Sequence, residues 1–172
     1  MKTIKEEVMN KKLFSLMLIA VFTSFVSLSA SAEEGAIRFS NKAFKQVITK
    51  NADGTTKFDY VEPKLVLPED VILYEIVFEN ISDKPVENIV VNNPIANNSK
   101  YRDGSATGDA TVITFSVDGK NFAAADALTV KDKSGKTWQA KPEDYTAIRW
   151  IYKKPLKPGE KAKVAYKTTI NK

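Results

Sequence analysis

This sequence has no His and no Cys, so the side chains that most often perform acid–base and nucleophilic catalysis are absent. Without them there is no Ser-His-Asp arrangement, no thiolate nucleophile and no His- or Cys-ligated metal. Paired carboxylates remain possible, as in glycoside hydrolysis. The acidic candidates are Asp103, Asp109, Asp118, Asp126, Asp132, Glu143 and Asp144. Most of them stand beside Gly, Ser or Pro, where turn capping explains them, and the sequence therefore predicts no catalytic residue and no enzyme.

Oxygen-rich and glycine-rich stretches are the residues of this sequence that could bind an ion or a phosphate. Asp103 and Asp109 could supply oxygen ligands to calcium, but their spacing matches no EF-hand loop. Residues 104–108 read GSATG and lack the Lys and the following helix of a phosphate-binding loop. The sequence therefore predicts neither a metal site nor a cofactor, with calcium as the open alternative.

Aromatic side chains toward the C-terminus could form a platform for a sugar. Trp150 is in phase with Ile148 and Tyr152, which favours a role in the core. Trp138 follows a turn and has charged neighbours, so it is the better candidate for a surface role. Trp138 and Tyr145 are accordingly predicted as the residues for surface contact.

The segments that must position these residues show a period of two, which is typical of β-strands with one face on a core. Apolar residues alternate with polar or acidic ones over 71–80, 111–117, 148–152 and 161–170. No segment after residue 32 sustains a period of 3.6, so we expect very little helix. The predicted core consists of Ile72, Tyr74, Ile76, Phe78, Ile113, Phe115, Trp150, Val164 and Tyr166.

Turn sequences separate these runs. Residues 52–54 (ADG), 118–119 (DG), 133–135 (KSG) and 158–159 (PG) are turn signals, because Gly tolerates positive φ. In the stretch ENISDKPVENIVVNNPI, residues 79–95, we expect one strand to end at Asn80 and a turn to run to Pro85. A second strand is expected over 86–91, with Ile89 and Val91 inward, stopping at Asn92-Asn93-Pro94. Seven or more short strands predict an all-β sandwich of two antiparallel sheets.

A resemblance extends this fold prediction. From Pro68 to Ile170, the order PEDVILYEIVFEN, SDKPVENIVVNNPI, YRDGSA, IRW and LKPGEKAKVAYKTTI resembles the conserved bacterial surface-repeat domain of unknown function. Residues 113–152 resemble a secreted, single-domain branch of that family. The resemblance implies an Ig-like β-sandwich, with NNPI at 92–95 departing from the family's usual motif and one copy in place of a tandem array. Its members have no assigned activity, so it implies no catalytic residue.

The N-terminal segment has the order of a secretory signal peptide. Lys11 and Lys12 precede an apolar run over 13–28, which is followed by Ala30-Ser31-Ala32. The apolar run of about 16 residues is shorter than the roughly 20 that a membrane span needs, which argues against an uncleaved anchor. We therefore expect residues 1–32 to be removed, and residues 33–172 to form the Ig-like domain. Met9 offers a more compact start than Met1, and both remain open.

Charge and Cys content limit the partners and the location. Residues 1–32 contain four Lys and two Glu, so the mature chain keeps 22 basic and 19 acidic side chains, a net charge of about +3. The three Arg of this part are far apart and form no cluster with aromatic residues, which argues against nucleic-acid binding. The C-terminal lysines are interpreted as a solvated strand face and a guarded edge. Without a Cys for lipid attachment, we expect an exported protein with no membrane span after processing, either periplasmic or extracellular.

Two functions fit these expectations. The first is a non-catalytic structural or adhesive module that binds a protein of the cell envelope through a sheet face or an edge strand. The alternative is a carbohydrate-binding or hydrolase accessory module. Exposure of Trp138 and Tyr145 together on one flat surface would favour the alternative. The oligomeric state stays open at this point.

The first prediction concerns processing. Cleavage after Ala32 gives a mature N-terminus at Glu33, because small residues occupy the positions that signal peptidase reads. Intact-mass measurement of the exported protein checks this, and a species that retains residues 13–28 would contradict it.

Overall fold

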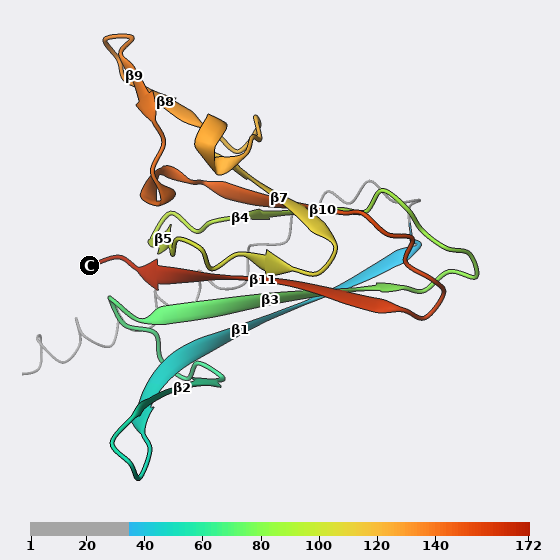
Figure 1. The fold of residues 1–172 in the computed structure, drawn as a ribbon, viewed down its shortest axis with the longest axis horizontal. Coiled ribbons are helices and arrows are strands. Elements are labelled where there is room, and N and C mark those ends of the chain that lie inside the picture. The colour runs from blue at the N-terminus through green and yellow to red at the C-terminus, as the bar shows by residue number, and fades with distance from the viewer. Residues whose placement is uncertain (1–34) are drawn as a thin grey trace, which may run out of the picture.

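The structure, a computed structural model, describes residues 35–172, and the expected signal peptide, Ala30, Ala32, both candidate start sites and Glu33 lie outside these residues. The described chain is all-β, with antiparallel pairing throughout and only short 3-10 turns beside the strands (Figure 1). The expectation of very little helix is confirmed for this part of the chain.

Two antiparallel sheets pack against each other, and a small third sheet stands apart from them (Figure 1). The larger sheet has the order β2-β1-β3-β11-β5, with β6 also paired to β11. Its strands are β1 (Ile37–Lys50), β2 (Thr56–Val61), β3 (Val71–Asn80), β5 (Ser99–Tyr101), β6 (Thr107–Gly108) and β11 (Lys161–Ile170). The smaller sheet, in the order β4-β10-β7, consists of β4 (Val90–Pro94), β7 (Thr111–Ser116) and β10 (Ala147–Tyr152).

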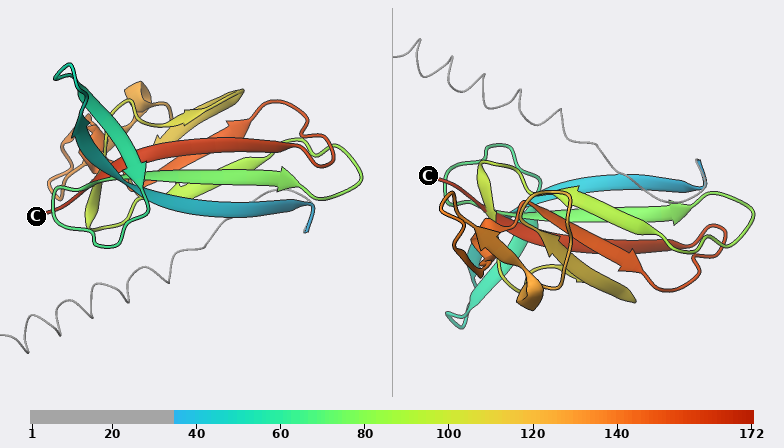
Figure 2. Two further views of the ribbon diagram at one scale, coloured as in Figure 1. Left: turned by 90° about the horizontal axis from the view of Figure 1, so that it is seen from below. Right: turned by 90° about the horizontal axis from the view of Figure 1, so that it is seen from above.

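Two hairpins project from the same end of the molecule. The β1–β2 hairpin extends the larger sheet, and the hairpin of β8 (Thr129–Lys131) and β9 (Thr137–Gln139) forms the third sheet. Figures 1 and 2 show that they reach out on opposite sides, beside the end of β11. Two 3-10 turns, η2 (Ala125–Ala127) and η3 (Pro142–Asp144), flank the β8–β9 hairpin.

The core lies between the two packed sheets and contains most of the predicted residues. Trp150 of β10 is fully buried, its ring centroid lies 5.9 Å from that of Tyr166 on β11, and its indole N–H donates to the Thr107 carbonyl at 3.1 Å. Phe78 of β3 meets Tyr152 of β10 edge-on at 5.4 Å. Of the nine predicted core residues, the following six are buried: Ile72, Ile76, Phe78, Trp150, Val164 and Tyr166. Tyr74, Ile113 and Phe115 are half-buried and pack against this core.

The stretch from residue 79 to 95 is partly as expected. β3 ends at Asn80, and the side chain of this buried residue organises the following turn. Its amide nitrogen donates to the carbonyls of Lys84 and Leu156, both at 2.7 Å, and its oxygen accepts from the Ser82 N–H and hydroxyl. All of its hydrogen-bonding capacity is used, so burial leaves no polar group unpaired.

The next strand was predicted too early. β4 begins at Val90 and not at residue 86, because Val86 forms only an isolated bridge to Leu156 and Asn88 has a positive φ of 57° that interrupts an extended chain. The strand continues through Asn92 and Asn93, which pair with β10, and ends at Pro94. Ile89 and Val91 are buried, as predicted.

The second prediction concerns the core. Trp150→Ala should lower the free energy of unfolding by about 3–5 kcal/mol, because it removes the largest side chain from between the sheets. Urea unfolding followed by circular dichroism measures the change. Trp138→Ala is the matched control and should cost under about 0.5 kcal/mol, since Trp138 is exposed. A loss below about 1 kcal/mol for Trp150→Ala would contradict the burial.

Candidate functional site

The two residues predicted for surface contact do not lie on one surface. Trp138 lies on β9 and is 41% exposed, whereas Tyr145 is only 6% exposed. The Tyr145 ring stacks on Phe115 at 4.6 Å and lies 5.8 Å from Tyr101, so it belongs to the core. The surface role expected for Tyr145 is therefore wrong. It follows η3 and precedes β10, outside any alternating run, so periodicity gave no sign of its burial.

Several of the acidic candidates are explained as turn caps. Asp118 accepts hydrogen bonds from the N–H groups of Lys120 and Asn121, both at 2.8 Å, and from the Ser116 hydroxyl. The N–H groups of Asn121 and Lys120 hold the pKa of Asp118 well below its usual range. Asp132 caps the β8–β9 turn in the same way, and its bond from the Ser134 hydroxyl lowers its pKa. These carboxylates are held ionised by the backbone and are not paired with each other.

No cluster of carboxylates for metal-ion binding emerges from the part of the chain that the structure describes. In residues 35–172, no three Asp or Glu side chains come together as a cation site. The two best-formed depressions are shallow, and each is lined by a single acidic residue: Glu87 near β10, and Glu62 beside β1. Hydrolysis by paired carboxylates requires two such groups on one substrate.

Exposed apolar side chains gather on one segment of the chain. Six large hydrophobic residues between positions 48 and 67 are exposed: Ile48, Phe58, Tyr60, Val61, Leu65 and Leu67. Ile48 is 69% exposed and Phe58 is 54% exposed. Single exposed apolar residues are ordinary, but a group of them on one element marks a site of interaction. The β1–β2 hairpin is therefore the candidate functional site.

The hairpin forms because β1 is long enough to pair with β3 along its first part and with β2 along its last part. Residues 37–45 of β1 pair with β3, and residues 45–50 pair with β2. In the turn, the Asn51 N–H donates to the Thr55 carbonyl at 2.9 Å, and Gly54 takes a φ of 83° that favours Gly. The Asp53 carboxylate accepts from the Thr55 N–H and hydroxyl, which closes the turn.

One face of the hairpin carries its two most exposed apolar side chains, Ile48 and Phe58. Ile48 pairs directly with Phe58, and Gln46 pairs with Tyr60. The Tyr60 hydroxyl donates to Gln46 at 3.3 Å, and the Lys167 ammonium of β11 lies 5.2 Å from the Tyr60 ring centroid. We call Ile48, Phe58 and Tyr60 together the hairpin surface.

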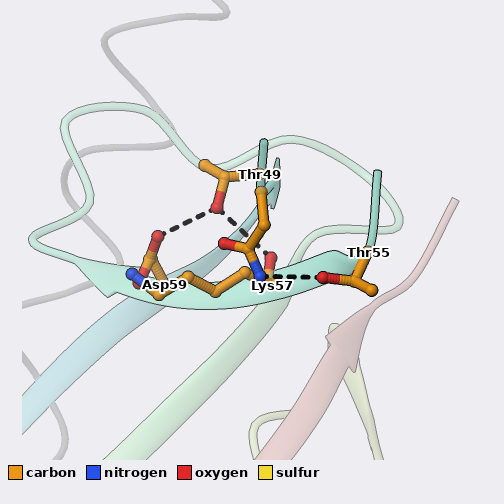
Figure 3. A network of polar contacts seen from close by, with 5 residues as sticks. Thr49, Thr55, Lys57 and Asp59 are labelled. Atoms are coloured by element: carbon orange, nitrogen blue, oxygen red, sulfur yellow. Dashed lines mark hydrogen bonds and ion pairs between the residues drawn. The ribbon is translucent and has the colours of Figure 1, made fainter. Parts of the chain in front are cut away.

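The opposite face of the hairpin carries a polar network. Lys57 and Asp59 form an ion pair at 2.7 Å along β2. Figure 3 shows the Thr49 hydroxyl between the Asp59 carboxylate, at 3.0 Å, and the Lys57 backbone carbonyl, at 3.4 Å. At the base of the hairpin, the Lys45 ammonium lies 2.7 Å from the Asp70 carboxylate. These contacts connect β2 to β1 and connect the base of the hairpin to the residue before β3.

The outer edge of β2 has no strand partner in residues 35–172. The same is true of β1 over residues 37–44, which pair with β3 alone, and of the outer edges of the short strands β8 and β9. β2 pairs only with β1, is six residues long and contains no Pro. On the opposite side of the larger sheet, β5 and β6 have three and two residues. In the smaller sheet, β4 ends in Pro94, and β7 is bridged to Ala123 through Phe115. Short strands and Pro are the usual protection of an edge, and β2 has neither.

The lysines of β11 are only in part at an edge. β11 pairs with β3 along one side, whereas on its other side β6 and β5 pair with residues 164–165 and 168–170 and leave residues 161–163 without a strand partner. The expected solvated face is present: Lys161 and Lys163 of β11 face Glu79 and Glu75 of β3, with ammonium–carboxylate distances of 3.7 and 2.8 Å. These pairs cross between neighbouring strands on the outer face of the sheet.

Comparison with known proteins adds no relative to this all-β, sandwich-like structure. No family model matches the chain, and neither a curated protein nor a solved structure matches it. Within residues 35–172, no helix is long and apolar enough to cross a membrane. The candidate site therefore rests on the hairpin itself.

The third prediction follows from the exposure of the hairpin surface. Phe58→Lys should change the free energy of unfolding by less than about 1 kcal/mol, since it loses mainly the cross-strand contact with Ile48. Urea unfolding of the variant beside the wild type measures this. A loss of 3 kcal/mol or more, of the order expected for a buried aromatic residue, would show that Phe58 serves folding and not recognition.

Proposed function

We propose that this protein is a non-catalytic, Ig-like module, exported to the periplasm or the cell exterior, that binds a protein of the cell envelope through its β1–β2 hairpin. The observation that carries the proposal is the coincidence of exposed apolar side chains and an unpaired strand edge on one hairpin. Its role is structural or adhesive.

The two features of the hairpin support binding in different ways. An open edge offers backbone N–H and C=O groups to an extended segment, which supplies affinity without demanding a particular sequence. The hairpin surface adds selectivity, because Phe58 and Tyr60 are aromatic and such residues carry much of the binding energy in interfaces. The polar network around Thr49 and Asp59 keeps the element ordered before binding, which reduces the entropy cost.

Export and family stay hypotheses that agree with this role. The signal-like segment over 11–32 and the strand and turn order from Pro68 to Ile170 are the observations behind them. A single copy of a surface-repeat domain suits a module that meets another envelope protein. The backbone capping of Asp118 and Asp132 supports a non-catalytic role, since these carboxylates are engaged in turns.

A carbohydrate-binding or hydrolase accessory module is the second candidate, and the exposure of Trp138 favours it. Trp138 lies on the β8–β9 hairpin, which projects from the same end as the β1–β2 hairpin (Figure 1). An exposed indole can stack on a sugar ring. However, the buried Tyr145 does not extend this surface.

The fourth prediction tests the proposed function. Immobilised exported protein should retain an envelope protein from extracts of its native cells, and Phe58→Lys should reduce the retained amount at least about tenfold, the size typical of a lost hot-spot contact. Ile81→Lys is the matched control, because Ile81 is also an exposed apolar residue but lies outside the hairpin. It should retain the partner at the wild-type level.

Two results would contradict the proposal. Equal retention by wild type, Phe58→Lys and Ile81→Lys would remove the hairpin from recognition. Saturable binding on a glycan array that is lost in Trp138→Ala and kept in Phe58→Lys would instead establish the carbohydrate-binding alternative.

A further inference from the structure

We propose that the open edge of β2 pairs with β2 of a second copy of this chain, antiparallel, about a two-fold axis at Phe58. This inference goes beyond the proposed function, because it assigns the β1–β2 hairpin a second partner, another copy of the same chain. Two observations support it: which residues of β2 direct their backbone N–H and C=O groups away from β1, and the order of charged side chains along the strand.

The first step is the direction of the backbone groups. The hydrogen bond from Asn51 to Thr55 marks residues 51 and 55 as a hydrogen-bonded pair. Such pairs alternate along an antiparallel ladder, so Lys57 and Asp59 direct their N–H and C=O groups toward β1. Thr56, Phe58 and Tyr60 consequently direct theirs toward the open edge. Three residues of β2 thus present three donors and three acceptors to a further strand.

The second step is to find the strand registers in which these outward-directed residues can pair. A second β2 must pair its own outward-directed residues, 56, 58 and 60, with those of the first copy. Three two-fold registers place at least two of these residues in hydrogen-bonded pairs. Their axes pass through Lys57, Phe58 or Asp59. The register centred on Phe58 is the one that engages all three residues of both strands.

The third step is charge, which selects the same register. An axis at Lys57 would place two lysines directly opposite each other, and an axis at Asp59 would do the same with two carboxylates. Like charges directly opposite each other destabilise a strand pair. An axis at Phe58 places Lys57 opposite Asp59 of the second copy, and Asp59 opposite its Lys57. The four charges then alternate in sign on one face of the paired strands.

The apolar face of the hairpin agrees with this register. Phe58 would lie opposite Phe58 of the second copy, and Tyr60 opposite its Thr56. The two Ile48–Phe58 cross-strand pairs would join into one continuous apolar strip on the side away from the charges. Burial of this strip supplies a hydrophobic contribution that a single copy cannot obtain. Aromatic cross-strand pairs add to it.

The charge order also distinguishes a second copy from an unrelated protein. Lys57 and Asp59 lie symmetrically about Phe58 with opposite signs, so the strand complements itself when it is reversed. The ion pair within each copy, at 2.7 Å, already places the two charges side by side. Pairing would therefore extend an existing charge arrangement and leave neither charge buried alone.

The fifth prediction tests this contact by sedimentation velocity of the exported protein between about 1 µM and 1 mM, the range of weak interfaces. Wild type should pass from monomer to dimer within this range. Lys57→Asp and Asp59→Lys should each raise the dissociation constant at least about tenfold, because each places like charges opposite one another twice. An equal mixture of the two variants should form a heterodimer near wild-type affinity.

The mixture is informative because neither variant retains the ion pair within its own strand. Recovery of association in the mixture can therefore come only from charges that meet between copies. Circular dichroism of each variant shows that it is folded. Asp118→Asn, a charge change in a turn far from β2 in sequence, is the matched control and should leave wild-type dimerisation unchanged.

Hydrogen exchange at low and high protein concentration supplies a second readout. The amides of Thr56, Phe58 and Tyr60 should exchange more slowly in the dimer, since they would gain partners across the edge. The amides of Lys57 and Asp59, already directed toward β1, should change little. Protection at alternate residues would distinguish backbone pairing from a contact of side chains alone.

The outcomes separate this inference from the proposed function. A monomer at about 1 mM, or a dimer that ignores both charge reversals, would overturn the self-pairing. If Phe58-dependent capture of an envelope protein persisted, the proposed function would still stand. Conversely, a dimer with the expected charge dependence and no captured partner would retain the self-pairing and remove the proposed envelope binding.

Discussion

No disulfide joins the two packed sheets of this protein, because the chain has no Cys, so the contact between them depends on the packing of side chains. Trp150 is the largest fully buried side chain between them, and it contacts Tyr166 of the facing sheet while its indole N–H is satisfied by Thr107. Burial in this layer raises the pKa of Tyr166, so its phenol stays protonated and packs as a neutral ring. The positions of β3, β10 and β11, and of every loop they carry, depend on this contact layer.

The alternation of β3 is strong enough to be read from sequence because one of its faces lies on the core and the other carries charged side chains. Its inward residues Ile72, Ile76 and Phe78 are buried, and its acidic outer face meets lysines of β11. Hydrogen bonds of the Asn80 side chain fix the turn that follows it, and this turn was predicted from the sequence. In contrast, the start of β4 depends on the bridge between Val86 and Leu156, 70 positions apart in the sequence. Such long-range pairing leaves no local pattern.

The candidate site was harder to predict than the fold. The turn at residues 52–54 was visible, but the apolar residues on either side of it look like ordinary strand residues. The register of β1 with β3 places Ile48 and Phe58 on the outer face of the larger sheet, the face that carries Glu75, and this long-range register leaves no mark in the local sequence. Tyr145 is the opposite case, because it was predicted as a surface residue and its contact with Phe115 places it in the core. Exposure is a property of the assembled layers and not of the residue type.

The arrangement of the sheet edges has a consequence for the size of any assembly. A strand that joins its own copy about a two-fold axis uses up its edge, so growth ends at two chains. A filament would require a second adhesive edge elsewhere on each subunit. In residues 35–172, β5 and β6 are very short and β4 ends in a proline, whereas residues 37–44 of β1 pair with β3 alone and keep a second edge without a strand partner. Growth beyond a pair joined through β2 would therefore have to use this part of β1.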